Sequence, residues 1–132
     1  KNSELKEKLE AIPVPPRLKA TVIGYTATID EYMRAAEIVV TKPGGLTTAE
    51  TLACGAAMAI MNPIPGQESR NSDFLLEHGA AVKINQIATM GAKIEKLLKD
   101  RDRLLTLRKS AQLLGKPRAA HDIVESVLGM CK

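Results

Sequence analysis

Aromatic residues are scarce in this chain, and their scarcity limits the partners that it can bind. They make up 2% of the 132 residues, as two Tyr, one Phe and no Trp. Proteins that hold single-stranded nucleic acid use aromatic side chains as stacking platforms for the bases. Although the formal net charge is +4, we therefore expect no nucleic-acid partner.

The chain also lacks a long apolar run and has few cysteines. No run approaches the roughly 18 apolar residues of a membrane-spanning helix, and neither end resembles a signal peptide, so nothing in the sequence indicates export. Cys54 and Cys131 lack the spacing of a metal site, and no cluster of His, Cys and Asp supplies one. We therefore expect no metal, and free thiols in a reducing compartment.

The length of the chain fits one domain and is short for an enzyme that binds two substrates. The sequence begins with Lys and enters a helical pattern at Ser3, so we expect residues 1–132 to be a single partial domain of a longer protein. Basic residues crowd the C-terminal third and indicate either a solvated face or contact with an anionic membrane surface. They are Lys96, Lys99, Arg101, Arg103, Arg108, Lys109, Lys116 and Arg118.

Short apolar runs alternate with helical patterns along the chain. We predict strands at 20–25, 37–41, 57–61 and 81–84. We predict helices at 3–11, 28–36, 47–54, from 67 or 69 to 77, and at 87–99, 101–114 and 118–130. This order predicts an α/β fold with parallel βαβ units, helices on both faces of the sheet and a helical C-terminal third. Ligands bind such sheets beyond the carboxyl ends of the strands, where the loops 24–28, 42–47 and 62–69 are expected to converge on one cleft.

The segment 42–50, Lys-Pro-Gly-Gly-Leu-Thr-Thr-Ala-Glu, is the most informative part of the chain. A buried strand precedes it, two glycines turn the chain, and a helix begins with its first amide groups unpaired, which makes an anion site. Glycine lets a phosphate approach the backbone because no Cβ intervenes. Glu50, one turn further, suits hydroxyl groups, so the segment predicts diphosphate on the turn and ribose on Glu50. Thr47-x-x-Glu50 also fits a capping box, which would be purely structural.

Further segments match a known family in the same order. They are 23–26 (Ile-Gly-Tyr-Thr), 35–50, 63–68 (Pro-Ile-Pro-Gly-Gln-Glu), Asn71 and 79–81 (Gly-Ala-Ala). This set resembles the C-terminal, donor-binding domain of two-domain Rossmann-type glycosyltransferases, in the branch of monogalactosyldiacylglycerol synthases and bacterial diacylglycerol glucosyltransferases. The resemblance implies a Rossmann-like parallel sheet truncated at its N-terminal end, because the family's opening strand and glycine-rich loop are absent, as is the acceptor domain.

The resemblance also implies a role for each matching residue. Backbone groups at Tyr25 and Thr26 would meet the uracil edge, although Tyr25 could instead only cover the edge of the sheet. The donor diphosphate would take amides or hydroxyls from Gly44, Gly45, Leu46 and Thr47, and Glu50 would hold the ribose. Gln67 and Glu68 would recognise the donor sugar, and Asn71 would touch the donor or hold the loop.

The function implied by the resemblance is that of the UDP-sugar-binding part of an inverting hexosyltransferase. Its acceptor would be a lipid, 1,2-diacylglycerol, and the full-length protein would be peripheral to the cytoplasmic face of the membrane. The UDP-sugar is a substrate, and no cofactor is required. The base that activates the acceptor is expected in the missing domain, so we predict no catalytic residue in this chain and no activity of the chain alone. The alternatives are an N-acetylglucosaminyl transferase acting on a lipid-linked cell-wall precursor, a sugar epimerase, and a non-catalytic nucleotide-binding module.

Overall fold

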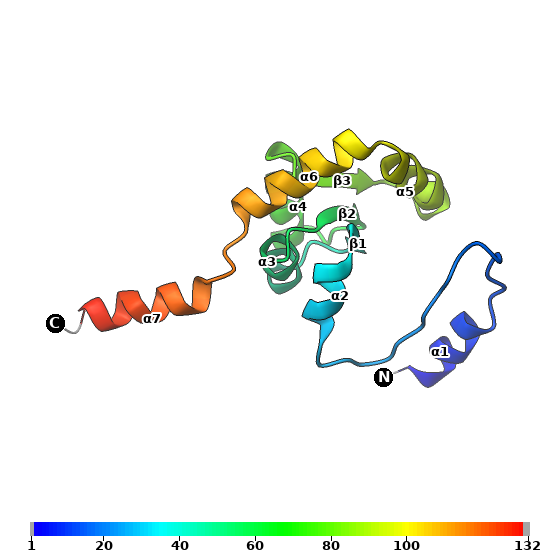
Figure 1. Cartoon of the computed structure of the whole chain (residues 1–132), viewed down its shortest axis with the longest axis horizontal. Helices are drawn as coiled ribbons and strands as arrows, with labels where there is room; N and C mark the ends of the chain where they lie inside the picture. Colours follow the sequence, from blue (N-terminus) through cyan, green and yellow to red (C-terminus); the bar gives the residue numbers. More distant parts are fainter. Residues whose placement is uncertain (1, 131–132) are drawn as a thin grey trace.

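Three short parallel strands form the central sheet of the computed structural model, which describes residues 2–130 (Figure 1). The strands are β1 (Ile38–Thr41), β2 (Ala57–Met61) and β3 (Ala81–Ile84), and they lie side by side in chain order. Met58 of β2 pairs with Val39 on one side and with Ala81 on the other. The first four residues of β2 are buried, as expected for the central strand of a parallel sheet covered on both faces.

Helices cover both faces of this sheet. α3 (Gly45–Ala53) and α4 (Gln67–Glu77) pack on one face, where Leu52 and Leu75 surround Met58. α5 (Met90–Lys99) and α6 (Arg101–Leu114) pack on the other face, where Leu97 and residues of α6 surround Ala57. Met58 and Ala57 are neighbours that point to opposite faces, as the two-residue period of a strand requires. The predicted α/β architecture with helices on both faces is confirmed.

Most helix ends lie where local signals predict them. Gly55 and Gly79 have positive φ angles of 67° and 65° and end α3 and α4 as left-handed caps. Asp100 accepts a hydrogen bond from the Arg103 amide at 3.1 Å and separates α5 from α6. The remaining helices are α1 (Ser3–Glu10), α2 (Ile29–Ala35), the short 3-10 helix η1 (Ile87–Thr89) and α7 (Ala119–Met130).

The predicted strand at residues 20–25 is wrong. This segment forms no strand, and Figure 1 shows it as part of an extended arm that joins α1 to α2. Its apolar residues Val22 and Ile23 instead line a hollow together with Leu5 and Leu9 of α1. A β-branched run becomes a parallel strand only where a neighbouring strand supplies hydrogen bonds in register, and this run has none beside it.

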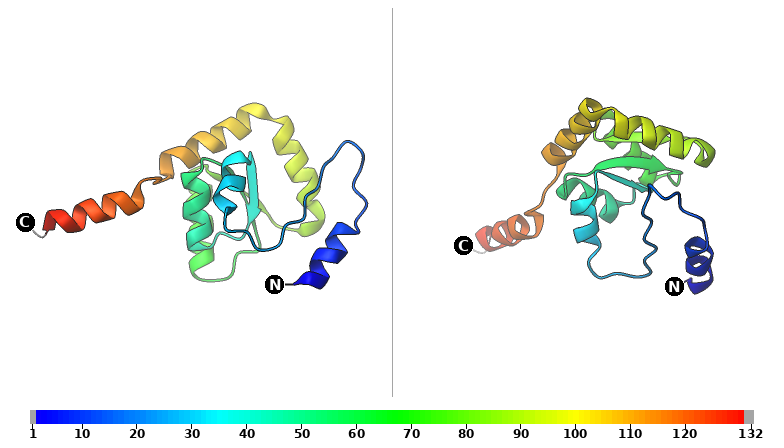
Figure 2. Two further views of the ribbon diagram at one scale, coloured as in Figure 1. Left: turned by 60° about the horizontal axis from the view of Figure 1, so that its bottom comes forward. Right: turned by 45° about the vertical axis from the view of Figure 1, so that its right-hand side comes forward.

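α7 projects away from the body of the molecule (Figure 2) and contains no buried residue. Among residues 2–130, no helix combines the length and the apolar character needed to cross a membrane. Cys54 is a free thiol, as predicted, whereas Cys131 lies outside the described residues.

Candidate functional site

The turn between β1 and α3 presents an open helix start. Pro43 is buried, and Gly44 is the N-cap of α3 with an extended backbone (φ −65°, ψ 153°). No side chain caps this helix. The amides of Gly45, Leu46 and Thr47 belong to the first turn, which has no intrahelical acceptors, and the positive end of the helix dipole lies there. The backbone therefore offers several donors to one anion.

The structure does not contain the capping box that Thr47 and Glu50 would form. α3 begins at Gly45, two residues before the predicted start, because the extended backbone of Gly44 already supplies the N-cap. Thr47 is thus the third helical residue, and its carbonyl accepts a hydrogen bond from Thr51 Oγ1 at 2.7 Å. Glu50 is exposed, and within residues 2–130 its carboxylate makes no hydrogen bond or ion pair. It is available to a ligand.

The loop between β2 and α4 is held by the side chain of Glu68. Its Oε2 accepts a hydrogen bond from the Ile64 amide at 2.7 Å. Its other oxygen, Oε1, lies 4.0 Å from the position of a Cβ built on Gly44. One carboxylate oxygen therefore holds the loop, while the other is directed toward the turn at Gly44 and Gly45, called the glycine turn below.

The start of α4 lies against the start of α3. Gln67 Nε2 is 3.6 Å from the position of a Cβ built on Gly45. Asn71 Nδ2 donates a hydrogen bond of 2.8 Å to the Pro43 carbonyl. The predicted convergence of loops 42–47 and 62–69 is therefore confirmed. Of the two roles considered for Asn71, the structure supports the loop-holding one.

Replacing Asn71 by alanine is expected to lower the free energy of unfolding by about 1 kcal/mol, because the carbonyl of the buried Pro43 loses its side-chain donor. Urea denaturation followed by circular dichroism measures this change. Arg70→Ala is the control, because Arg70 is the exposed preceding residue of the same helix. Equal denaturation midpoints for the two variants would show that the Asn71 bond does not hold the loop.

Two buried hydroxyl groups close to this site were not singled out by the sequence pattern. Within the described part of the chain, Thr48 Oγ1 and Ser72 Oγ are buried and have no hydrogen-bond partner. Thr48 belongs to α3 and Ser72 to α4. The spacing of Thr48, Thr51 and Leu52 at i, i+3 and i+4 is the signal that could have marked this buried face of α3.

The third loop does not join the other two. Thr26 Oγ1 accepts a hydrogen bond from the Thr28 amide at 3.1 Å, just before α2. At the start of α2, the Asp30 carbonyl lies 3.9 Å from the sulfur of Cys54, which is the C-cap of α3. The loop therefore lies near the end of α3 opposite to Gly45, roughly 13 Å away along a nine-residue helix.

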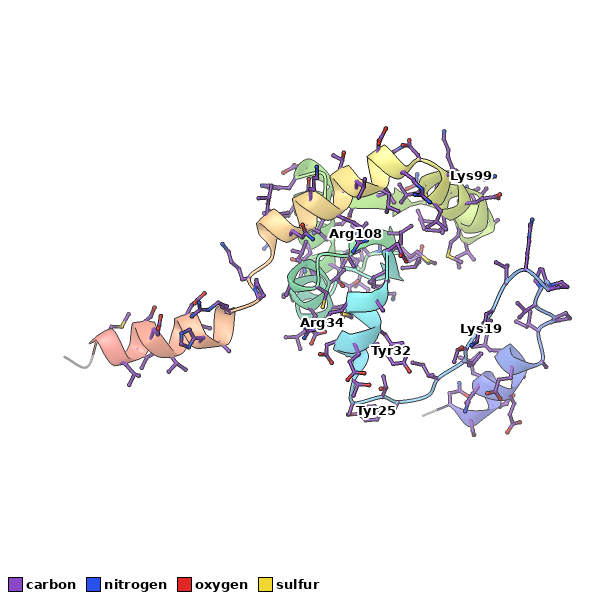
Figure 3. The ribbon with its side chains drawn as sticks, viewed as in Figure 1. Lys19, Tyr25, Tyr32, Arg34, Lys99 and Arg108 are labelled. Carbon is purple, nitrogen blue, oxygen red and sulfur yellow. The ribbon has the colours of Figure 1, made fainter. Side chains whose placement is uncertain are left out.

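Tyr25 belongs to this third loop and therefore also lies away from the glycine turn. This residue is 83% exposed, and Figure 3 shows it at the end of α2 that points away from the sheet. The physical reason is that residues 20–25 do not join the sheet, so the loop after them does not start from its carboxyl edge. The uracil-binding role of Tyr25 and Thr26 stays a prediction.

The site contains no metal-binding cluster. Among residues 2–130, no group of three His, Cys, Asp or Glu residues lies close enough to hold an ion. The site consists of the backbone amides at the start of α3, the carboxylates of Glu50 and Glu68, and the side-chain amide of Gln67. Such a set can bind a phosphate ester that also carries hydroxyl groups.

Comparison with known proteins places the chain among glycosyltransferases. Residues 2–123 match the model of the glycosyltransferase family 28 C-terminal domain. The chain is 35% identical over 128 residues to the processive diacylglycerol beta-glucosyltransferase of Bacillus subtilis, and 37% identical over 130 residues to a protein of the same name from Bacillus cereus. These alignments cover 97% of the chain but 34% and 33% of the relatives, so the chain spans about a third of their length.

Proposed function

Because the chain belongs to the glycosyltransferase family 28 C-terminal domains, we propose that it is the UDP-sugar-binding part of an inverting hexosyltransferase. The acceptor of the whole enzyme is a lipid, 1,2-diacylglycerol. Two relatives are named for that lipid and for transfer of glucose, which supports this acceptor class. The whole enzyme works as a peripheral protein at the cytoplasmic face of the membrane.

The uncapped start of α3 is the observation that carries this proposal. The diphosphate of the donor binds the amides of Gly45, Leu46 and Thr47, and Gly44 and Gly45 leave room for it. When the glycosidic bond breaks, negative charge develops on the leaving UDP. Backbone dipoles fixed in this orientation stabilise that charge without having to reorganise.

The polar side chains around the turn bind the hydroxyl groups of the donor. Glu50 lies one to two turns along α3 from the amides, so one extended ligand can reach both, and its free carboxylate accepts hydrogen bonds from the ribose. Gln67 and the Oε1 atom of Glu68 lie beside the same turn and recognise the sugar. The base that activates the acceptor belongs to a part of the enzyme outside this chain, so the chain alone binds the donor and does not transfer it.

Calorimetric titration with UDP, GDP and dTDP tests the proposal. We expect selective binding of UDP and a loss of about 10- to 100-fold in UDP affinity for Glu50→Ala, because a hydrogen bond to a charged group contributes about 1.5–3 kcal/mol. Glu77→Ala is the matched control, since it removes the same charge from the exposed last residue of α4.

The outcomes separate the remaining alternatives. Equal binding of all three nucleotides, unchanged in Glu50→Ala, would favour a non-catalytic nucleotide-binding module. In a second titration, with UDP-N-acetylglucosamine and UDP-glucose, tighter binding of UDP-N-acetylglucosamine would favour transfer to a lipid-linked cell-wall precursor. Absence of UDP binding would contradict the assignment of the donor site to these residues.

A further inference from the structure

A second hollow lies at the edge strand β3 of the sheet. The residues that line it are far in sequence from the glycine turn. The hollow has a volume of about 350 Å³ and is formed by β3, α5 and the start of α6, which Figure 1 shows side by side. Val82 and the buried Leu97 contribute apolar surface to it. Four cationic side chains also line it, namely Lys83, Lys93, Lys96 and Arg103.

These four cations are not neutralised by ion pairs. Within residues 2–130, none of them forms a salt bridge. Lys99, which also lies in α5, does form an ion pair. Its Nζ binds Glu95 Oε1 at 2.7 Å and lowers the pKa of that carboxyl. The one acid that lines the hollow, Asp100, accepts a hydrogen bond from the Arg103 amide and caps α6. The hollow therefore carries an excess of positive charge.

Protection of the sheet edge explains only part of this charge. Lys93 Nζ donates a hydrogen bond of 3.1 Å to the Lys83 carbonyl on the edge strand β3. Lysine on an edge strand discourages pairing with another sheet, so Lys83 and Lys93 have a structural role. Lys96 and Arg103 come from two helices and are not needed for it. Their presence at the same hollow is therefore not explained by protection of the sheet edge.

We propose that this hollow binds the phosphate of an anionic phospholipid, so that β3, α5 and the start of α6 face the membrane surface. The inference rests on the proposed function, in which the acceptor is a membrane lipid. A hollow lined by four cations and by apolar side chains complements a phosphate attached to a glycerol backbone, and clustered basic residues are attracted to anionic lipids.

Sedimentation with vesicles tests the proposal. The chain is mixed with vesicles of phosphatidylglycerol and phosphatidylcholine, or of phosphatidylcholine alone. The test variant is Lys93→Ala/Lys96→Ala/Arg103→Ala, and we expect it to bind the anionic vesicles at least about tenfold more weakly than the unmodified chain. The matched control, Lys109→Ala/Lys116→Ala/Arg118→Ala, loses the same charge from exposed positions elsewhere and is expected to keep most of the binding. Circular dichroism confirms that both variants are folded.

Three results would overturn the proposal: equal losses for the two triple variants, equal binding to both kinds of vesicle, or binding of inorganic phosphate without binding of vesicles. Titration of the test variant with UDP separates this site from the donor site. We expect unchanged UDP affinity, because the substituted residues lie outside the glycine turn. A chain that binds anionic vesicles through this hollow but does not bind UDP would contradict the proposed function and leave the lipid site standing.

Discussion

Replacing Gly45 by leucine is expected to abolish UDP binding without unfolding the chain. A Cβ at this position would lie 3.6 Å from Gln67 Nε2, which is an ordinary van der Waals contact. Gly45 is helical and exposed, so the backbone accepts leucine and helix propensity improves. The rest of the leucine side chain, however, occupies the space in front of the first amides. Loss of two charge-assisted hydrogen bonds of about 1.5–3 kcal/mol each predicts at least a roughly 100-fold weaker affinity.

Calorimetry with UDP, together with thermal unfolding of the same samples, measures both parts of this expectation. Gly129→Leu is the control, because Gly129 lies in α7 with no atom within 4 Å of its Cβ position. It adds the same side chain to a helix remote from the turn and is expected to leave UDP affinity unchanged. Normal UDP binding by Gly45→Leu would show that the diphosphate does not bind the start of α3.

The parts of the fold that depend on local signals could be predicted from the sequence. α6 spans the predicted residues 101–114, because Asp100 caps its start and the Gly115-Lys116-Pro117 segment ends it. The approach of Gln67 to Gly45 is not local in the sequence. It was nevertheless predictable, because the carboxyl ends of adjacent parallel strands meet at one edge of a sheet.

The predictions that were wrong depend on a neighbouring segment that the local sequence pattern does not reveal. Residues 20–25 have the composition of a buried strand, but composition does not say whether another strand lies beside them. That one error also misplaced Tyr25 and Thr26, because their predicted position assumed that a strand led to them. The start of α3 was misplaced for another reason. Thr and Gly are about equally preferred as N-caps, so preference does not decide between Thr47 and Gly44, and the extended backbone of Gly44 sets the start.

Gly115→Ala is expected to destabilise the fold by about 2–3 kcal/mol, the upper part of the range for overpacking. A Cβ on Gly115 would lie 2.4 Å from the Leu52 carbonyl oxygen, 2.8 Å from the Leu52 carbonyl carbon and 3.1 Å from the Ala53 nitrogen. All three are backbone atoms of α3, so no flexible side chain can move aside. The φ of −63° suits alanine, and the cost is therefore steric.

Gly91→Ala is the matched control and is expected to change stability in the opposite direction. Gly91 lies in α5 with no atom within 4 Å of its Cβ position. Alanine in a helix is favoured over glycine by about 0.5–1 kcal/mol. Urea denaturation followed by circular dichroism measures both variants. A midpoint for Gly115→Ala at or above that of the unmodified chain would contradict the close approach of α6 to α3.

The place of this contact also predicts how Gly115→Ala affects binding. Gly115 meets α3 at Leu52, near its C-terminal end, where Arg108 of α6 (Figure 3) also donates a hydrogen bond of 3.2 Å to the Gly55 carbonyl. The amides proposed to bind the diphosphate lie at the other end of α3, where Asn71 holds the turn through Pro43. While the variant is folded, its UDP affinity should therefore stay within about twofold of the unmodified chain, since sites without shared partners act almost independently. A parallel loss of stability and affinity would instead show that α3 shifts as a rigid unit.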